Sequence, residues 1–137
     1  MAFDLSLLAA TPDLRSVPPV HARLVCAMRY AHMARASGNC PAEGLARYLG
    51  GPGALRGFRV FMDEAGRAWP DPIALHHPCD ASFSYDEMLL VDLATAAARN
   101  DRGRFDTFAR DMIGRSGREA IWRSARRLMR HLVTVTQ

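Results

Sequence analysis

Side chains that can bind a metal ion gather in one proline-containing segment of the sequence, residues 71–83. This segment holds two histidines, a cysteine and an aspartate close together: His76, His77, Cys79 and Asp80. These residue types are ligands in zinc and iron sites. A zinc site also needs a second ligand pair at a fixed spacing, and none follows in the sequence, although Cys26, His32 or Cys40 could approach in the fold.

We therefore take His76, His77 and Cys79 as candidate residues for a metal or small-ligand site, and we predict no cofactor. In the alternative interpretation, the two histidines bond to backbone groups in a turn and Cys79 is a small buried apolar residue.

No other group of residues predicts catalysis. Cys79 with His76 or His77 is the one local thiol–base pair, and its spacing in a loop does not establish the geometry that nucleophilic catalysis requires. Helix capping explains the carboxylates of Asp86 and Glu87, and Asp92 is expected on the outer stripe of a helix. The sequence therefore favours a protein that is not an enzyme.

Positive charge is concentrated in the C-terminal part of the chain. From residue 99 onward there are ten arginines against four acidic residues, whereas the first 98 residues hold eight arginines against ten acidic residues. The last predicted helix carries four arginines, expected on the face opposite Trp122: Arg123, Arg126, Arg127 and Arg130. A basic helical face is typical of nucleic-acid binding through phosphate contacts, but it is also the ordinary solvated side of an amphipathic helix.

Helical periodicity runs through most of the chain. Apolar residues at spacings of three and four, with proline and glycine between the segments, predict helices over 20–36, 41–49, 84–100, 102–113 and 116–133. Ser84 with Glu87, and Ser116 with Glu119, match the capping-box pattern of a helix start. The apolar helix 84–100 is expected at the centre of the fold.

The pattern of residues 52–69 is compatible with two secondary structures, a helix and a β-hairpin. Leu55, Phe58, Met62, Ala65 and Trp69 follow helical spacing, whereas residues 58–62 followed by Asp63-Glu64-Ala65-Gly66 could form a strand entering a hairpin. We favour the helix. The predicted fold is an all-α single-domain bundle of about five helices over residues 1–137, with residues 1–17 as an N-terminal arm. The alternative is an α+β fold with one small hairpin near 57–69.

Composition indicates a cytoplasmic protein. The longest apolar run, 88–98, is interrupted by Asp92 and is shorter than the roughly 20 residues that cross a membrane. The apolar N-terminus has an acidic residue where a signal peptide has basic ones. Three widely spaced cysteines are typical of reduced thiols.

The C-terminal part of the sequence also resembles a family of short helical proteins from alphaproteobacteria. The resemblance covers about the last 60 residues and depends on Pro78-Cys79, on Ser84-x-Asp86-Glu87-x-Leu89-Leu90, and on Asp101-Arg102 before Phe105. It implies a bacterial cytosolic protein without an assigned activity, and it identifies no functional residues.

Together these features predict a non-enzymatic interaction or regulatory protein that binds a protein partner or forms a homodimer, away from membranes. One alternative is a small nucleic-acid-binding protein that uses the arginines of the last helix. The other is metal or small-ligand binding at the loop His76–Cys79.

Overall fold

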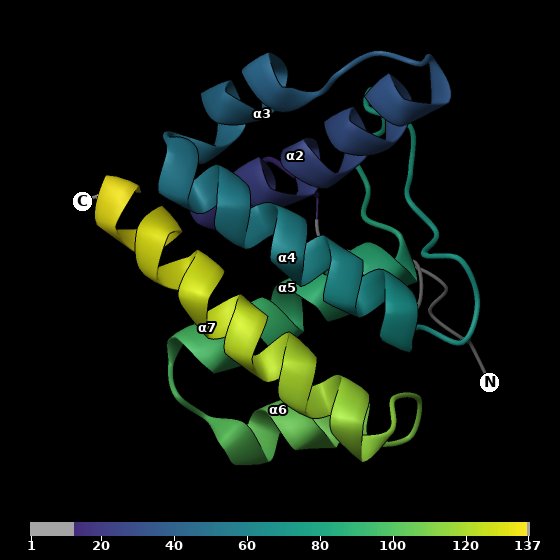
Figure 1. The fold of residues 1–137 in the computed structure, drawn as a ribbon, viewed down its shortest axis with the longest axis vertical. Coiled ribbons are helices and arrows are strands. Elements are labelled where there is room, and N and C mark those ends of the chain that lie inside the picture. The colour runs from purple at the N-terminus through teal and green to yellow at the C-terminus, as the bar shows by residue number, and fades with distance from the viewer. Residues whose placement is uncertain (1–12, 137) are drawn as a thin grey trace, which may run out of the picture.

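The computed structural model describes residues 13–136, and their side chains as far as Leu132. Within this range the chain forms six α-helices, and its only β-type pairing is an isolated bridge between Asp13 and Ser82. The helices are α2 (Pro19–Ala36), α3 (Ala42–Leu49), α4 (Pro52–Ala68), α5 (Tyr85–Ala98), α6 (Arg102–Ala109) and α7 (Arg115–Thr136) (Figure 1). The expected all-α single-domain bundle is confirmed, with six helices instead of about five. Most of the expected N-terminal arm, residues 1–12, lies outside the described residues.

The segment 52–69 is helical, so the alternative hairpin near 57–69 is wrong. Pro52 occupies the first turn of α4, where its missing N–H costs nothing. Phe58, Phe61 and Ala65 are all buried. A strand would place Phe58 and Phe61 on opposite faces, whereas a helix turns both toward the core.

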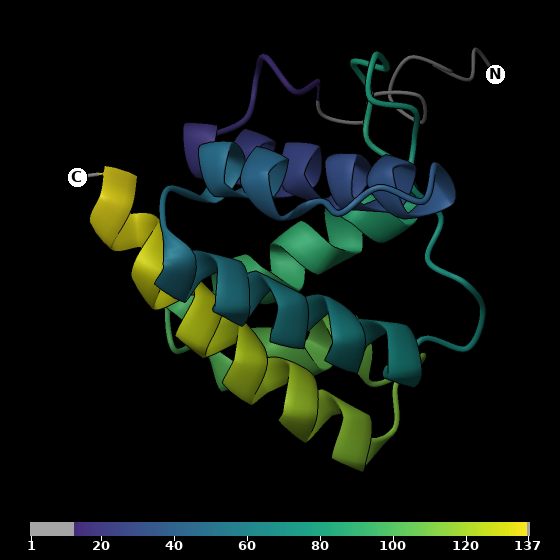
Figure 2. The same cartoon turned by 45° about the horizontal axis from the view of Figure 1, so that its top comes forward.

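Helices α4 and α7 lie side by side and antiparallel over most of their lengths, as two views of the fold show (Figures 1 and 2). At one end the His131 ring packs over Gly53, and at the other Gly117 lies against Ala68. Between these ends, a Cβ atom built on Gly57 would lie 3.1 Å from the Cα of Leu128. The absence of a side chain at Gly57 therefore lets the two helices approach closely.

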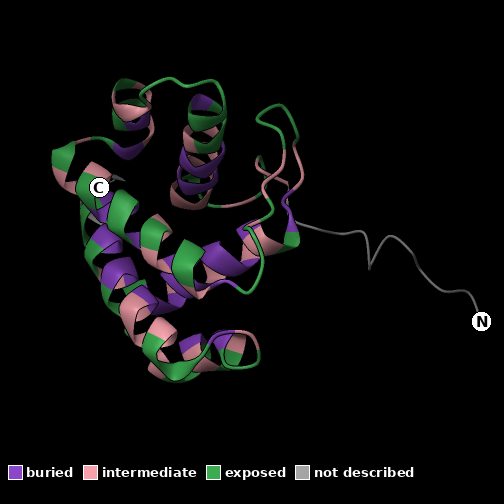
Figure 3. Ribbon diagram, turned by 45° about the vertical axis from the view of Figure 1, so that its right-hand side comes forward, coloured by how far each residue is buried: buried purple, intermediate pink, exposed green. Residues whose placement is uncertain are grey.

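Helix α5 lies at the centre of the bundle, as the sequence predicts. It contacts α2, α6 and α7, and its side chains are buried around most of its circumference (Figure 3). Leu90, Leu93, Ala94 and Ala97 have no exposed surface. Among the described residues, no helix is both long and apolar enough to span a membrane.

One of the two predicted capping boxes is confirmed. At the start of α5, the Glu87 N–H donates to the Ser84 hydroxyl at 3.0 Å, and the Ser84 N–H donates to the Glu87 carboxylate at 2.8 Å. The second prediction is wrong, because α7 already begins at Arg115 and the Glu119 carboxylate accepts a hydrogen bond from Arg102.

Two helix ends also differ from the prediction. Helix α6 ends at Ala109, four residues before the expected end at Ile113, because the chain tightens into a turn in which both Met112 N–H and Ile113 N–H donate to the Ala109 carbonyl. Helix α7 continues to Thr136, beyond the expected fraying point at Val133.

Candidate functional site

The loop between α4 and α5 is fastened to the core by a buried ion pair. Arg29 on α2 and Glu87 on α5 are 1% and 0% exposed. The Arg29 guanidinium donates to both carboxylate oxygens of Glu87, at 2.8 and 2.9 Å. Two more of its N–H groups donate to the carbonyls of Asp80 and Ser82, at 2.6 and 2.7 Å. One buried arginine thus joins α2, α5 and the loop.

Glu87 accepts further hydrogen bonds from the loop and from its own helix start. The His76 N–H donates to it at 3.1 Å, in addition to the Ser84 N–H of the capping box. Burial raises the pKa of Glu87, but the hydrogen bonds from Arg29, Ser84 and His76 outweigh this and hold the pKa below its ordinary value. The hydrogen bond to Glu87 raises the pKa of Arg29. Both groups are therefore charged at neutral pH.

The side chains of the candidate metal residues bond mainly to the loop itself. The His76 ring is 2.9 Å from the Ser82 carbonyl and 3.5 Å from the Asp80 carboxylate. The His77 ring accepts a hydrogen bond from the Cys79 N–H at 3.2 Å. This matches the alternative in which the histidines bond to backbone groups.

Cys79 is exposed, so the part of the alternative interpretation that made it a small buried apolar residue is wrong. Within the described residues, no three His, Cys, Asp or Glu side chains are placed to hold a metal ion. Cys26, His32 and Cys40 thus supply no second ligand pair for His76, His77 and Cys79.

A polar cluster lies where α5 meets α2 and the start of α6. His21, Thr95 and Asp92 line a cavity of about 240 Å³ together with Arg99 and Arg104. The His21 ring is 3.0 Å from the Thr95 hydroxyl, which donates to the Val91 carbonyl.

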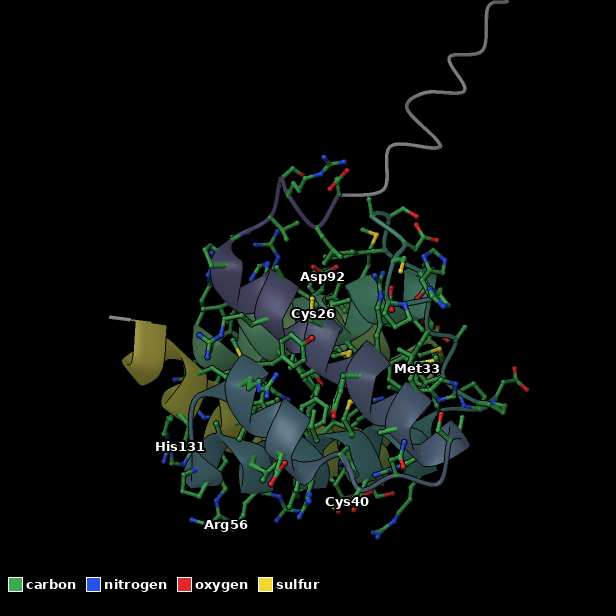
Figure 4. All side chains as sticks on the ribbon, turned by 90° about the horizontal axis from the view of Figure 1, so that it is seen from above. Cys26, Met33, Cys40, Arg56, Asp92 and His131 are labelled. Atoms are coloured by element: carbon green, nitrogen blue, oxygen red, sulfur yellow. The ribbon has the colours of Figure 1, made fainter. Side chains whose placement is uncertain are left out.

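Asp92 is half-buried there, and burial raises its pKa. The expected place of Asp92 on the outer stripe of its helix is therefore corrected, because residues of α2 and α6 partly cover it. Figure 4 shows Asp92 next to α2, on the same side of the molecule as Cys26. Asp92, Thr95 and Arg99 recur at intervals of three and four residues, so they lie along one side of α5. Only the packing of α2 and α6 encloses that side.

The four arginines of the last helix divide into two kinds. Arg126 lies against the Trp122 ring, 5.5 Å from its centroid, and donates to the Ala97 carbonyl and the Asn100 side chain at 3.0 and 2.7 Å. It therefore binds the C-terminal end of α5, and its expected place opposite Trp122 is wrong. Arg123, Arg127 and Arg130 are exposed.

Helix α4 extends this exposed positive surface. Because His131 packs over Gly53, the first turns of α4 lie beside the last described turns of α7. Figure 4 places Arg56 and His131 on the same side of the molecule. We define the α4–α7 basic face as five exposed residues: Arg56, Arg123, Arg127, Arg130 and His131. Neither 52–62 nor 120–136 contains an Asp or Glu.

Comparison with protein-family models, with curated proteins and with solved structures found no match to this chain. The resemblance to alphaproteobacterial proteins therefore stays a prediction. The functional proposals below depend on the contacts and charges of this chain alone.

Proposed function

We propose that this protein is a non-enzymatic binding protein whose α4–α7 basic face contacts the phosphate backbone of a nucleic acid. The observation that carries the proposal is the segregation of charge: five exposed basic residues come from segments of two adjacent helices, 52–62 and 120–136, that contain no Asp or Glu. Phosphate neutralisation by such residues, with release of counterions, supplies most of the affinity of sequence-independent binding.

The spacing of the arginines suits an extended polyanion. Arg123, Arg127 and Arg130 recur at intervals of four and three residues, so they follow one side of α7. They span roughly 10 Å of helix at about 1.5 Å of rise per residue. Arg56 widens the row from the neighbouring helix. Such a row can contact several successive phosphates of one strand.

The same face favours nucleic acid over a membrane surface. Membrane-binding helices combine basic residues with exposed large apolar ones. On α4, Val60 is 44% exposed, but the apolar residues of α7 that pack on the core, such as Leu128 and Leu132, have no exposed surface.

The α4–α7 basic face also has few side chains of the kinds that recognise individual bases. Helices α4 and α7 contain no Asn or Gln for base-specific hydrogen bonds. Trp122 packs against Phe105 and Arg102 instead of standing free for base stacking. We therefore propose backbone contact without sequence preference, in the bacterial cytoplasm where nucleic acids are accessible. A homodimer would present two such faces to one duplex.

Fluorescence anisotropy with a labelled 20-base-pair DNA duplex tests the proposal. We expect a Kd of about 10⁻⁵ M at low salt that weakens steeply as NaCl increases. The double variant Arg56→Gln with Arg127→Gln should lower the slope of log K against log[salt] by about two, because each arginine accounts for about one phosphate contact. The matched control, Arg35→Gln with Arg59→Gln, removes the same charge from outside the face and should keep the slope.

Equal slopes in the two double variants would show that net charge alone attracts the DNA, and would contradict the proposal. So would the absence of binding at low salt up to a protein concentration of about 1 mM, well above the usual range for non-specific complexes. Tighter binding to phosphatidylserine vesicles than to DNA would assign the face to a membrane instead.

A further inference from the structure

A largely apolar cavity lies between α2, α4 and the loop that precedes α5. Its volume is about 280 Å³. Its inner wall is formed by apolar side chains from α2, α3, α4 and the loop: Met28, Leu45, Phe58, Met62, Ile73 and Leu75. None of these residues belongs to the α4–α7 basic face, so this cavity is a separate site.

The polar residues of this cavity all carry or can carry positive charge. His32, Arg35 and Arg59 line it and are exposed, so they stand at its mouth. Neither Arg35 nor Arg59 forms an ion pair with any residue between 13 and 132. No Asp or Glu lines the cavity.

This charge pattern is not general to the molecule. A second cavity, of about 380 Å³ between α5 and α6, is also partly apolar, but Asp92 and Asp111 line it and no basic residue does. The two cavities thus differ in the sign of the charge that a ligand would meet.

The loop wall of the first cavity is held rigidly in place. On either side of Ala74, Ile73 and Leu75 face the cavity. The Ala74 N–H donates to Asp86 at 2.8 Å, and the Ser84 hydroxyl donates to the Ala74 carbonyl at 2.6 Å. Farther along the loop, the Arg29–Glu87 pair fixes the backbone of His76, Asp80 and Ser82. A wall fixed before binding reduces the entropy lost when a ligand enters.

We propose that this cavity binds a small monocarboxylate with an apolar body, such as a medium-chain fatty acid. The apolar part replaces water against Phe58, Met62 and Leu75, and the carboxylate lies at the mouth between Arg35 and Arg59. Guanidinium groups hold carboxylates through paired, charge-assisted hydrogen bonds. The cavity has about twice the volume of one that takes up benzene, which sets the body at roughly eight to ten carbon atoms. The flexible thioethers of Met28 and Met62 adapt to bodies of different shape.

Isothermal titration calorimetry with octanoate and decanoate tests this proposal. We expect a Kd of about 10⁻⁴ M, consistent with a ligand of this size. Octan-1-ol and octylamine, which keep the chain but remove or reverse the charge, should bind at least about tenfold more weakly. The variant Arg35→Gln with Arg59→Gln should weaken octanoate binding by about tenfold or more. The matched control, Arg56→Gln with Arg127→Gln, should bind octanoate as the wild type does.

Backbone NMR locates the ligand independently of these variants. Octanoate should shift the amide signals of Ile73, Ala74 and Leu75 more than those of Met88 and Met112, which line the α5–α6 cavity. Octanol binding as tightly as octanoate would overturn the proposal. Unchanged octanoate affinity in the Arg35/Arg59 variant, or shifts centred on Met88 and Met112, would do the same. The DNA experiment uses the other pair of arginines, so either proposal can fail while the other stands.

Discussion

Arg29 and Glu87 join the helical core to the loop that lines the monocarboxylate cavity. Both are buried, and between them they satisfy two loop carbonyls, one loop N–H and the N-terminus of α5. Removing one member of a buried ion pair lowers the free energy of unfolding more than removing one member of an exposed pair does, because the charge of the remaining partner stays buried without compensation.

At this residue scale, Glu87→Gln should lower the free energy of unfolding by about 3 to 5 kcal/mol. The amide keeps the shape of the carboxylate but leaves the Arg29 charge unpaired. Glu119→Gln is the matched control, because its pair with Arg102 is partly exposed, and it should lower the free energy of unfolding far less than Glu87→Gln does. Urea denaturation at pH 7 measures both, and a loss for Glu87→Gln no larger than the control would contradict the role given to the buried pair.

The same pair predicts a dependence on pH. The folded-state pKa of Glu87 lies below its ordinary value, which is about 4.3 in an unfolded chain. Its stabilising contribution is therefore complete above that value and is lost as the pH falls through the folded-state pKa. The difference in stability between wild type and Glu87→Gln should shrink in acid over this range.

At the scale of elements, α4 meets the backbone of α7 at Gly57. Gly57 and Gly66, both on α4, have opposite surroundings. A Cβ atom at Gly57 would lie 3.1 Å from the Leu128 backbone, whereas a Cβ atom at Gly66 would have no neighbour within 4 Å. Backbone cannot yield as a flexible side chain can, so the two positions should respond differently to the same substitution.

Gly57→Ala should destabilise the protein by about 1 to 3 kcal/mol, because it forces α4 and α7 apart. Gly66→Ala adds a methyl group in open space and removes backbone freedom from the unfolded chain, so it should stabilise the protein by roughly 0.5 to 1 kcal/mol. Thermal unfolding followed by circular dichroism distinguishes them. Equal effects of the same sign would show that α4 and α7 do not meet at Gly57 as described.

At the scale of the whole molecule, α4 and α7 bring the two halves of the chain together. Helix α4 belongs to the first half and α7 to the second, and their contact is the most extensive between any two helices within residues 13–136. The two halves therefore share one core and should unfold together.

Two single-tryptophan variants test this cooperativity. Trp122→Phe leaves Trp69 at the end of α4 as the fluorescent probe, and Trp69→Phe leaves Trp122 on α7. In each variant, the urea midpoint from fluorescence should match that from far-ultraviolet circular dichroism. A fluorescence midpoint that differs from the circular dichroism midpoint in either variant would reveal two separately folding units.

The sequence by itself determined most of the helices and one of their caps. Helical spacing placed 52–69 in a helix, and the Ser84–Glu87 capping box formed as predicted. These features depend on hydrogen bonds and side-chain directions within a few residues, so the local sequence contains the information. The same local pattern at Ser116 forms no capping box: α7 already begins at Arg115, and Arg102, 17 positions away in sequence, donates to the Glu119 carboxylate.

Only the tertiary structure decided which charges are buried, paired or exposed. Arg29 meets Glu87 across 58 positions of sequence, and Asp92 is half-buried because α2 and α6 enclose it. Arg126 binds the C-terminal end of α5 and is therefore not part of the α4–α7 basic face, whereas Arg56 on α4 belongs to that face. The sequence pointed to the segment 71–83 but not to the cavity beside it. Burial and charge pairing depend on which surfaces meet, and that is determined by the packing of whole helices and not by neighbouring residues.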